Sequence, residues 1–263
     1  MTNIAILGAG NIGKALAKGF LRTSKQEIQL QLVVRREEHR QSLLQEGYAA
    51  TLDASAAIAA ARVVILAVTP GQIAALNSSI AGQIKDHHFV ISAVSSVSIA
   101  TLRNQLGTQA PIVRVMPNIA AAIGQSMTAL AWEDRDATAG PEADRLFQRI
   151  GKTMIIKENQ MMAATVLCAC STAFFLRAIR AAAQGGTQIG FHPEEALPVA
   201  AQVALGAAGL VLEEAAHPET EIDRVTTPQG STIAGLIEME YNGFSSALIR
   251  GMVTSHEKTR GLS

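Results

Sequence analysis

Three glycines near the start of the chain constrain its fold more than any other feature. They follow a short apolar stretch, Ile4–Leu7, and stand at Gly8, Gly10 and Gly13, in the spacing G-x-G-x-x-G. In a strand–turn–helix unit the first glycine permits the tight turn, the second lets a phosphate approach the backbone, and the third lets the helix pack close to the strand. Small or apolar residues then recur at helical spacing, at Ile12, Ala15, Leu16, Gly19 and Phe20. The pattern predicts a Rossmann-type unit whose helix N-terminus binds a pyrophosphate.

Strand-like and helix-like stretches continue to alternate after this unit. Apolar runs predict strands at 28–34, 63–68, 89–94 and 112–115, and the segments between them predict helices at 37–46, 53–61, 72–80 and 98–106. Such alternation is typical of a doubly wound α/β sheet, and we expect it to form an N-terminal dinucleotide-binding domain over residues 1–156. An ordinary strand–turn–helix with accidental glycines is the alternative, but strand, turn and helix occur here in the required order.

Ligands of doubly wound sheets bind outside the carboxyl ends of the strands. That rule places the glycine turn and the segments after the later strands around one crevice. The predicted cofactor-binding residues are Leu7, Gly8, Ala9, Gly10, Asn11, Ile12, Arg35, Arg36, Ala67, Val68, Pro70, Ala93, Val94, Met116 and Asn118.

The second predicted strand ends in two arginines, Arg35 and Arg36. An NAD-binding domain normally carries an acidic residue here that binds the ribose 2′-hydroxyl, whereas an arginine binds the 2′-phosphate of NADP. The pair therefore favours NADPH over NADH. The alternative is a solvated charge cluster, since Glu37 and Glu38 follow at once.

The composition excludes several classes of function. The chain of 263 residues has 22 basic and 22 acidic side chains and no basic run, which argues against a nucleic-acid partner or an anionic membrane surface. The six histidines and two cysteines show no metal-ligand spacing, so we expect no metal. The N-terminus lacks the features of a signal peptide, and a reducing, cytoplasmic location fits. The uncharged run Met161–Leu176 is short for a membrane span.

From about Lys157 the pattern becomes entirely helical. We expect helices near 158–183, 193–214, 230–241 and 243–260, separated at Gly185-Gly186 and around His217-Pro218, in an all-α domain over residues 157–263. The stretch Leu197–Leu212 is apolar nearly all round and must be buried on every side. A small domain has too little interior for such helices. We therefore predict an obligate homodimer, which a folded, active monomer at nanomolar dilution would refute.

A second informative stretch is Val225–Leu236, with sequence VTTPQGSTIAGL. Its hydroxyl residues cluster around Pro228 and Gly230, just before a predicted helix. Ser231 or Thr232 can cap that helix, and its free N–H groups can bind a small carboxylate. The alternative on spacing alone is a turn with an ordinary N-cap.

The chain resembles the pyrroline-5-carboxylate reductase family over essentially its whole length. Val225–Leu236 is similar to the specific signature of that family, and three other segments also match it: the glycine turn, Leu66–Pro70 and Arg114–Asn118. The resemblance implies NAD(P)H-dependent reduction of 1-pyrroline-5-carboxylate to L-proline, the last step of proline synthesis. It also implies a Rossmann domain followed by an interlocking dimerisation domain, with dimers that in this family often form a ring of five.

The resemblance also implies a substrate site. Gly230, Ser231 and Thr232 would bind the substrate carboxylate through backbone N–H groups, and the Thr232 hydroxyl, the implied catalytic group, would lie near the ring nitrogen. Glu158 would lie near the substrate as well. The chain departs from the family pattern where Gln229 and Ser95-Ser96 replace a glycine and an Ala-Gly pair. It also departs at Thr69, near Ala54, at Cys168–Phe174 and at Arg224.

The residue chemistry agrees with reduction of a cyclic imine. If the imine nitrogen arrives protonated, an orienting hydroxyl is enough and no strong acid is needed. A β-hydroxyacid dehydrogenase is an alternative, but such enzymes need a lysine in the first long helix, and no lysine occurs between Lys157 and Lys258. A non-catalytic NADPH sensor is a second alternative, because fold alone does not imply function.

Overall fold

The computed structural model describes residues 1–24, 26–213 and 216–260, and the chain forms two compact units. One comprises Met1–Ala169 with the end of the chain from Ser255, and the other comprises Cys170–Thr254. The domain boundary predicted between residues 156 and 157 follows a change of sequence pattern and stays a prediction. Each unit is described below by itself.

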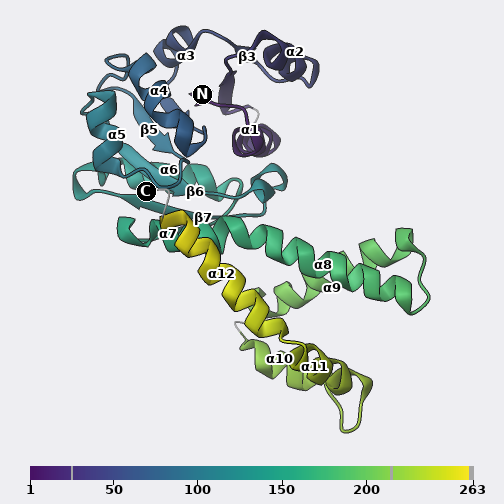
Figure 1. The fold of residues 1–263 in the computed structure, drawn as a ribbon. Helices are drawn as coiled ribbons and strands as arrows, with labels where there is room; N and C mark the ends of the chain where they lie inside the picture. Colours follow the sequence, from purple (N-terminus) through teal and green to yellow (C-terminus); the bar gives the residue numbers. More distant parts are fainter. Residues whose placement is uncertain (25, 214–215, 261–263) are drawn as a thin grey trace. The chain divides into compact units, whose positions relative to one another are not determined.

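The first unit is built on one eight-stranded sheet of order β3-β2-β1-β4-β5-β6-β7-β8 (Figure 1). The strands are β1 (Thr2–Leu7), β2 (Ile28–Val33), β3 (Ala50–Thr51), β4 (Val63–Leu66), β5 (Phe89–Ser92), β6 (Ile112–Met116), β7 (Ser126–Trp132) and β8 (Gly151–Ile155). Neighbours from β3 to β6 are parallel, β7 is antiparallel to β6, and β8 is parallel to β7. The central strands β4 and β5 are buried throughout, as parallel strands covered on both faces must be.

Helices cover both faces of this sheet (Figure 1). They are α1 (Asn11–Ser24), α2 (Glu37–Gln45), α3 (Ala54–Ala60), α4 (Pro70–Ile80), α5 (Ile99–Leu106) and α6 (Ala139–Gln148). On one face α1 and α6 meet through Phe20 and Phe147, whose rings pack edge to face with centroids 5.7 Å apart. On the other face α3, α4 and α5 bury Ile58, Ile80 and Leu102. The predicted Rossmann-type, doubly wound class is confirmed.

The sequence patterns missed the part of the sheet that runs against the main direction. After β6 the chain turns through a 3-10 helix, η1 (Ile119–Ile123), which ends at Gly124 in the left-handed conformation, φ 77°. The returning strand β7, the 3-10 turn η2 (Asp134–Asp136), helix α6 and strand β8 were not predicted, nor was the short β3. Small alanine and threonine residues in β7 obscure its alternation, and pairing with β6 decides its conformation instead.

Described residues after Ile155 contain no strand, as predicted, and form a helical region. Its elements are η3 (Glu158–Gln160), α7 (Met161–Ala164), the π-helical η4 (Thr165–Cys170), α8 (Ser171–Gln188), α9 (Pro193–Glu213), α10 (Pro218–Val225), α11 (Ser231–Tyr241) and α12 (Phe244–Arg260). Helix α10 lies where a break was predicted: His217 caps it by accepting from the Glu219 N–H, and Pro218 suits its first turn. The predicted helix end at residue 214 lies outside the described residues.

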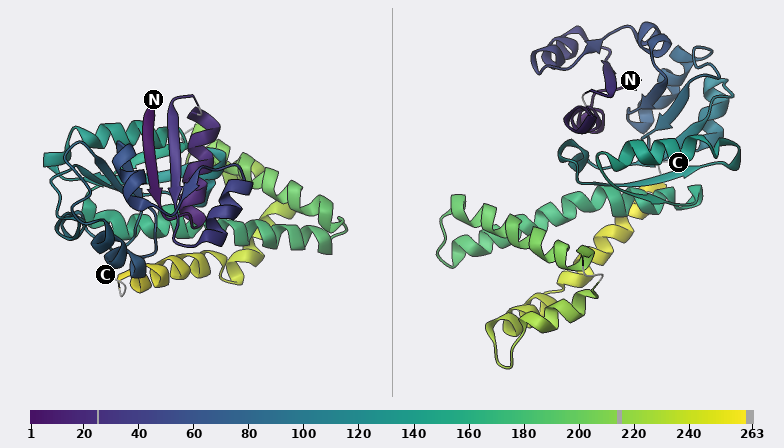
Figure 2. Two further views of the ribbon diagram at one scale, coloured as in Figure 1. Left: turned by 90° about the horizontal axis from the view of Figure 1, so that it is seen from above. Right: turned by 180° about the vertical axis from the view of Figure 1, so that it is seen from behind.

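The helices of the second unit expose an unusual amount of apolar surface. Helices α8 and α9 lie side by side in both views of Figure 2, and Gly186 of α8 allows a close approach to Ala196 of α9. Large apolar side chains nevertheless remain at least half exposed, among them Phe175, Ile189, Val203, Leu205, Leu212, Tyr241 and Ile249. A single chain therefore leaves much of this surface uncovered.

Two helical stretches are long and apolar enough, by length and composition alone, to cross a membrane. They are Glu158–Gln188 and Pro193–Glu213. In the most apolar 18 residues of each stretch, 22% and 6% respectively are buried within the chain. The first contains Arg177 and Arg180, and the second contains Pro198. A further subunit and a lipid phase are the two environments that could cover such helices, and arginines near the middle of a span are costly in lipid.

His88 makes the stability of the first unit depend on pH. It is 2% exposed, its Nδ1 accepts from the Lys85 N–H at 2.7 Å, and its Nε2 lies 3.1 Å from the Ile58 carbonyl oxygen. These partners fit a neutral ring that donates from Nε2. Burial lowers the pKa of His88 below its usual 6.5, and the neighbouring His87 adds to the effect.

We expect acidification to destabilise the protein through this histidine. The unfolded chain takes up a proton near pH 6.5 while the folded protein resists, so the stabilising contribution is present above that pH and is lost as pH falls towards the lower folded pKa. Urea unfolding of wild type and His88→Gln, measured from about pH 5 to about pH 7.5, gives the free energy of unfolding across this pH range. The wild type should lose more free energy of unfolding on acidification than the variant. Parallel losses in the two proteins would contradict the role of His88.

Candidate functional site

The glycine turn has the geometry of a phosphate-binding loop. Gly8 has φ +106°, and a Cβ there would lie 2.6 Å from the Ala67 carbonyl oxygen, so the turn abuts the end of β4. A Cβ on Gly13 would lie 2.0 Å from the Gly8 carbonyl oxygen, which ties α1 closely to the turn. A Cβ on Gly10 would meet nothing within 4 Å. The backbone at Gly10 is therefore open to a ligand at the N-terminus of α1, as a pyrophosphate would require.

Backbone hydrogen bonds join the ends of the central strands beside this turn. The Gly8 N–H donates to Val33 at the end of β2, the Ala67 N–H to Leu7, and the Ala93 N–H to Leu66. The structure thus brings together the predicted cofactor-binding residues that follow β1, β4 and β5. Leu7, Ala9 and Val94 are buried, so they can offer a ligand only their backbone. Pro70 opens α4, where Thr69 and Gln72 form a capping box.

Arg35 and Arg36 are exposed at the carboxyl end of β2, and no described acidic residue pairs with either of them. Glu37, the competitor in the charge-cluster interpretation, is bound instead by Arg40 and Gln41. The hydrogen bond from Arg40 lowers the pKa of Glu37 to about 2, so the Glu37 carboxylate is ionised. Its hydrogen-bond partners, Arg40 and Gln41, lie on the same helix. Both guanidinium groups of the pair are thus available to an anion next to the glycine turn.

Glu158 opens the helical stretch Glu158–Gln188, as predicted, and lies in the 3-10 turn η3 that precedes α7. Its Oε1 accepts from the Ile99 N–H at 2.7 Å and from Arg114 Nη1 at 3.1 Å. It thereby caps the N-terminus of α5 and neutralises an arginine that is only 5% exposed. Burial lowers the pKa of Arg114, and the Glu158 hydrogen bond opposes that effect. One carboxylate oxygen of Glu158 therefore already has two protein partners.

The side chains of Met116 and Asn118, at the end of β6, both point into the protein. Met116 is buried against Met161 and Cys168. Asn118 Nδ2 donates to the Cys168 carbonyl oxygen at 2.8 Å, while its Oδ1 accepts from the Ala120 N–H. The π-helical turn η4 presents that carbonyl outside the regular helical pattern. Any cofactor contact at these two positions would therefore involve the backbone.

The second candidate cluster, at the start of α11, differs from prediction in its cap. Gly230 is the N-cap and no side chain caps the helix, so the proposed capping by Ser231 or Thr232 is wrong. The Gly230 N–H closes a turn on the Thr227 carbonyl oxygen at 2.9 Å, and the helix begins at Ser231, one residue after the predicted start. The hydroxyls of Ser231 and Thr232 are exposed and have no partner among the described residues.

Tight local geometry holds this turn in place. A Cβ on Gly230 would lie 2.4 Å from Thr227 Oγ1 and 3.0 Å from the Thr227 carbonyl oxygen, so a larger residue there would require Thr227 to shift. Gln229 adopts φ +58°, a left-handed conformation in which glycine is the usual residue. The first-turn N–H groups of α11, at Ser231, Thr232 and Ile233, face away from any helical acceptor. The turn thus offers amides and hydroxyls without a charged side chain, and these groups suit a small carboxylate.

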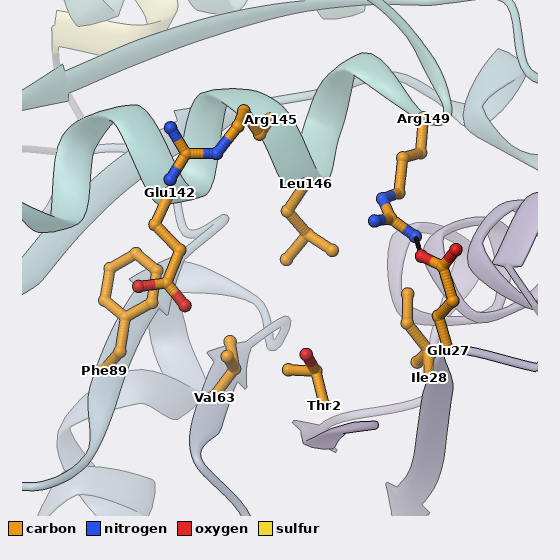
Figure 3. Close-up of a pocket in the computed structure, with 9 residues that line it drawn as sticks. All are labelled: Thr2, Glu27, Ile28, Val63, Phe89, Glu142, Arg145, Leu146 and Arg149. Carbon is orange, nitrogen blue, oxygen red and sulfur yellow. Dashed lines mark hydrogen bonds and ion pairs between the residues drawn. The ribbon is translucent and has the colours of Figure 1, made fainter.

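A pocket in the first unit lies at the amino-terminal ends of the parallel strands, opposite the carboxyl ends (Figure 3). It has a volume of about 170 Å³ and is lined by the first residues of four strands, Thr2, Ile28, Val63 and Phe89, together with Glu27 and side chains of α6. Figure 3 shows Arg149 turned towards Glu27, with which it forms an ion pair. Because ligands of such sheets bind at the carboxyl ends, this pocket is separate from the cofactor crevice.

Sequence reasoning missed two residues of the crevice region. Arg114 was noted as part of a matching segment, but its pairing with Glu158 joins positions 44 residues apart and left no local signal. Ser96, in the β5–α5 loop, has φ +65° and a buried hydroxyl without a partner among the described residues. The signal for Ser96 was present in the sequence, as a serine where the family pattern has glycine.

Two family models match the chain in succession. One described as NADP oxidoreductase coenzyme F420-dependent matches residues 3–96, and one described as pyrroline-5-carboxylate reductase dimerisation matches residues 158–262. The first covers the glycine turn and the arginine pair. The second covers Glu158 and the turn before α11.

Curated relatives resemble the chain along nearly its whole length. Pyrroline-5-carboxylate reductase 2 of Dictyostelium discoideum is 42% identical over 98% of this chain and 92% of its own length. Pyrroline-5-carboxylate reductase 1 of the same organism is 46% identical over 98% of this chain, which spans 49% of that protein. The crystal structure of Plasmodium falciparum pyrroline carboxylate reductase with NADP bound superimposes with a TM-score of 0.89 and 20% identity, covering 99% of this chain and 98% of the other.

Proposed function

The chain belongs to the pyrroline-5-carboxylate reductase family, and from that premise we propose that it catalyses the NAD(P)H-dependent reduction of 1-pyrroline-5-carboxylate to L-proline. It is an oxidoreductase of proline biosynthesis. The observation that supports the proposal is the start of α11, which offers free amides and two unpartnered hydroxyls and no charged side chain. Such a site suits a substrate that brings its own charges, a carboxylate and a protonated ring nitrogen.

The residues of the first unit fit a dinucleotide. The open backbone at Gly10 and the first-turn amides of α1 would hold the pyrophosphate, and Arg35 and Arg36 would hold a 2′-phosphate. The backbone of Ala67, Val68, Ala93 and Val94 would line the other half of the crevice. When bound, the cofactor supplies a hydride. In support of NADP, the matched oxidoreductase model is an NADP family, and a structural neighbour binds NADP.

The remaining catalytic work is to hold the imine. We infer that the amides of Ser231 and Thr232 bind the substrate carboxylate and that the Thr232 hydroxyl accepts the N–H of the protonated ring nitrogen. Gly230 keeps the turn tight enough for this geometry. Glu158, whose Oε1 accepts from the Ile99 N–H and from Arg114, would lie near the substrate. Rate enhancement then comes mainly from positioning two bound reactants rather than from acid catalysis.

Residues 158–262 match the dimerisation model of the family, so the protein is a homodimer. A second copy would cover the apolar side chains that α8, α9 and α12 expose. We propose further that the protein is cytoplasmic and does not enter a membrane, which the arginines within the first apolar stretch support. Assembly of five dimers is a finer proposal. Light scattering that gives a mass of two chains at all concentrations would refute it.

Thr232 is the residue whose substitution tests this mechanism most directly. Thr232→Val keeps the shape of the side chain but removes its hydroxyl, and a hydrogen bond to a charged group contributes about 1.5–3 kcal/mol. We expect kcat/KM for pyrroline-5-carboxylate to fall by roughly 10- to 100-fold, with NADPH affinity unchanged. Thr232→Ser, the matched control, should retain most activity. The measurement is NADPH oxidation under saturating cofactor, and full activity in the valine variant would remove Thr232 from the mechanism.

A further inference from the structure

Ser96 adopts a backbone conformation that serine rarely takes. Its φ of +65° lies in the left-handed region, and within the described ranges Gln229 is the only other non-glycine residue there. A side chain in this region is strained unless the surrounding structure requires it, and such residues concentrate at binding and catalytic sites. Glycine would occupy this position without strain. The fold of the loop alone therefore does not explain why a serine occupies this position.

The Ser96 hydroxyl forms no hydrogen bond with the described residues. Its Oγ is buried and without a hydrogen-bond partner. The neighbouring serines differ: Ser92 Oγ accepts from the Val94 N–H at 3.4 Å, and Ser98 Oγ caps α5 by accepting from the Thr101 N–H at 3.1 Å. Buried polar groups in folded proteins are almost always paired, so an unpaired one points to a partner that the isolated chain lacks.

The position of Ser96 identifies the kind of partner. It follows β5, whose continuation at Ala93 bonds to the end of β4. In a doubly wound sheet a dinucleotide lies across the point where strand order reverses, between β1 and β4 in this sheet. The glycine turn after β1 and the arginines after β2 serve the adenosine side. The loop after β5 is on the other side of the reversal, the side of the nicotinamide nucleotide.

We propose that the Ser96 hydroxyl hydrogen-bonds the nicotinamide nucleotide half of the cofactor, which makes Ser96 a positioning residue for the nicotinamide. This inference rests on the proposed function, because it needs a bound dinucleotide. The same hydroxyl serves NADPH and NADH alike, since the two cofactors share that half. Arg35 and Arg36, by contrast, would distinguish between them.

Two variants separate the hydroxyl from the backbone strain. Ser96→Ala removes the hydroxyl and keeps the strain, whereas Ser96→Gly removes both and should raise the melting temperature. Isothermal titration calorimetry of the full-length protein with NADPH, with NADH and with adenosine 2′,5′-bisphosphate measures the affinity for each ligand. We expect both variants to bind NADPH and NADH about tenfold more weakly, by the same factor for each, as loss of one hydrogen bond predicts. Affinity for the bisphosphate, which lacks the nicotinamide nucleotide, should not change.

Ser98→Ala is the control, because Ser98 caps α5 and has a partner already. It should lower the melting temperature without changing affinity for either cofactor. Affinities of the Ser96 variants within twofold of wild type, or an equal loss of affinity for the bisphosphate, would overturn the proposal. Failure of the wild type to bind NADPH would instead overturn the proposed function. The two failures are therefore distinguishable in one set of titrations.

Discussion

Gly13→Ala is expected to lose both stability and NADPH binding, whereas Gly10→Ala is expected to lose only NADPH binding. The two glycines stand in the same turn but meet different surroundings. A Cβ on Gly13 would lie 2.0 Å from the Gly8 carbonyl oxygen, so either α1 or the turn must move. Forcing extra volume into such a contact costs about 3 kcal/mol in free energy of unfolding, and the displaced turn no longer presents its amides.

Gly10 has open space where its Cβ would be, and it stands just before the first residue of α1. Alanine there should change the free energy of unfolding by less than about 1 kcal/mol. The added methyl group would occupy the space through which a pyrophosphate approaches the backbone. We expect NADPH to bind about 100-fold more weakly, equivalent to about 2.8 kcal/mol.

Urea unfolding and NADPH titration of both variants measure the two effects separately. Each variant is the control for the other, because both add one methyl group to the same turn. Two results would contradict the prediction. Wild-type affinity in Gly10→Ala would mean that no ligand approaches the backbone there, and wild-type stability in Gly13→Ala would mean that the turn relaxes easily.

Replacing Arg35 and Arg36 together with serine is expected to weaken NADPH binding about 10- to 100-fold and to leave NADH binding nearly unchanged. Each charge-assisted hydrogen bond to a phosphate contributes about 1.5–3 kcal/mol, reduced here by exposure to solvent. NADH lacks the 2′-phosphate, so it loses nothing directly. Both arginines lack an acidic partner among the described residues, so their removal leaves no carboxylate unpaired.

Steady-state KM values for the two cofactors measure this difference. Arg62→Ser is the matched control, because it removes an exposed arginine that pairs with Glu142. Arg62 precedes β4 and so lies at the amino-terminal ends of the strands, away from the predicted cofactor site. It should change neither KM. A rise of KM by the same factor for NADPH and NADH in the double variant would rule out the 2′-phosphate as the ligand of the pair.

Local patterns in the sequence were enough to predict the framework of this protein. The glycine turn and the apolar runs that form β1, β4 and β5 are periodic features of continuous segments, and their meaning does not depend on distant residues. The change to apolar helices after Lys157 is of the same kind. The hydroxyl-rich turn at 225–236 was recognisable because its residue types and spacing are specific. These features predicted the fold class, and the resemblance of the turn to the family signature predicted the family.

Other properties depend on contacts between residues far apart in the chain. Pairing with β6 makes a strand of β7, whose own alternation is weak. The bond to the Cys168 carbonyl turns the Asn118 amide inward, and Glu158 reaches both Arg114 and the start of α5. Ser96 shows both sources of information: the sequence marks it as a departure, and the structure reveals its left-handed backbone and unpaired hydroxyl.

The sequence by itself determined strands β1, β2, β4, β5 and β6, most of the helices, and the positions of the glycine turn and the hydroxyl-rich turn, because propensity and periodicity act within a few residues. Only the tertiary structure decided which polar atoms are already satisfied and which remain free for a ligand. That distinction depends on pairing and burial between distant segments, and a linear pattern does not contain them.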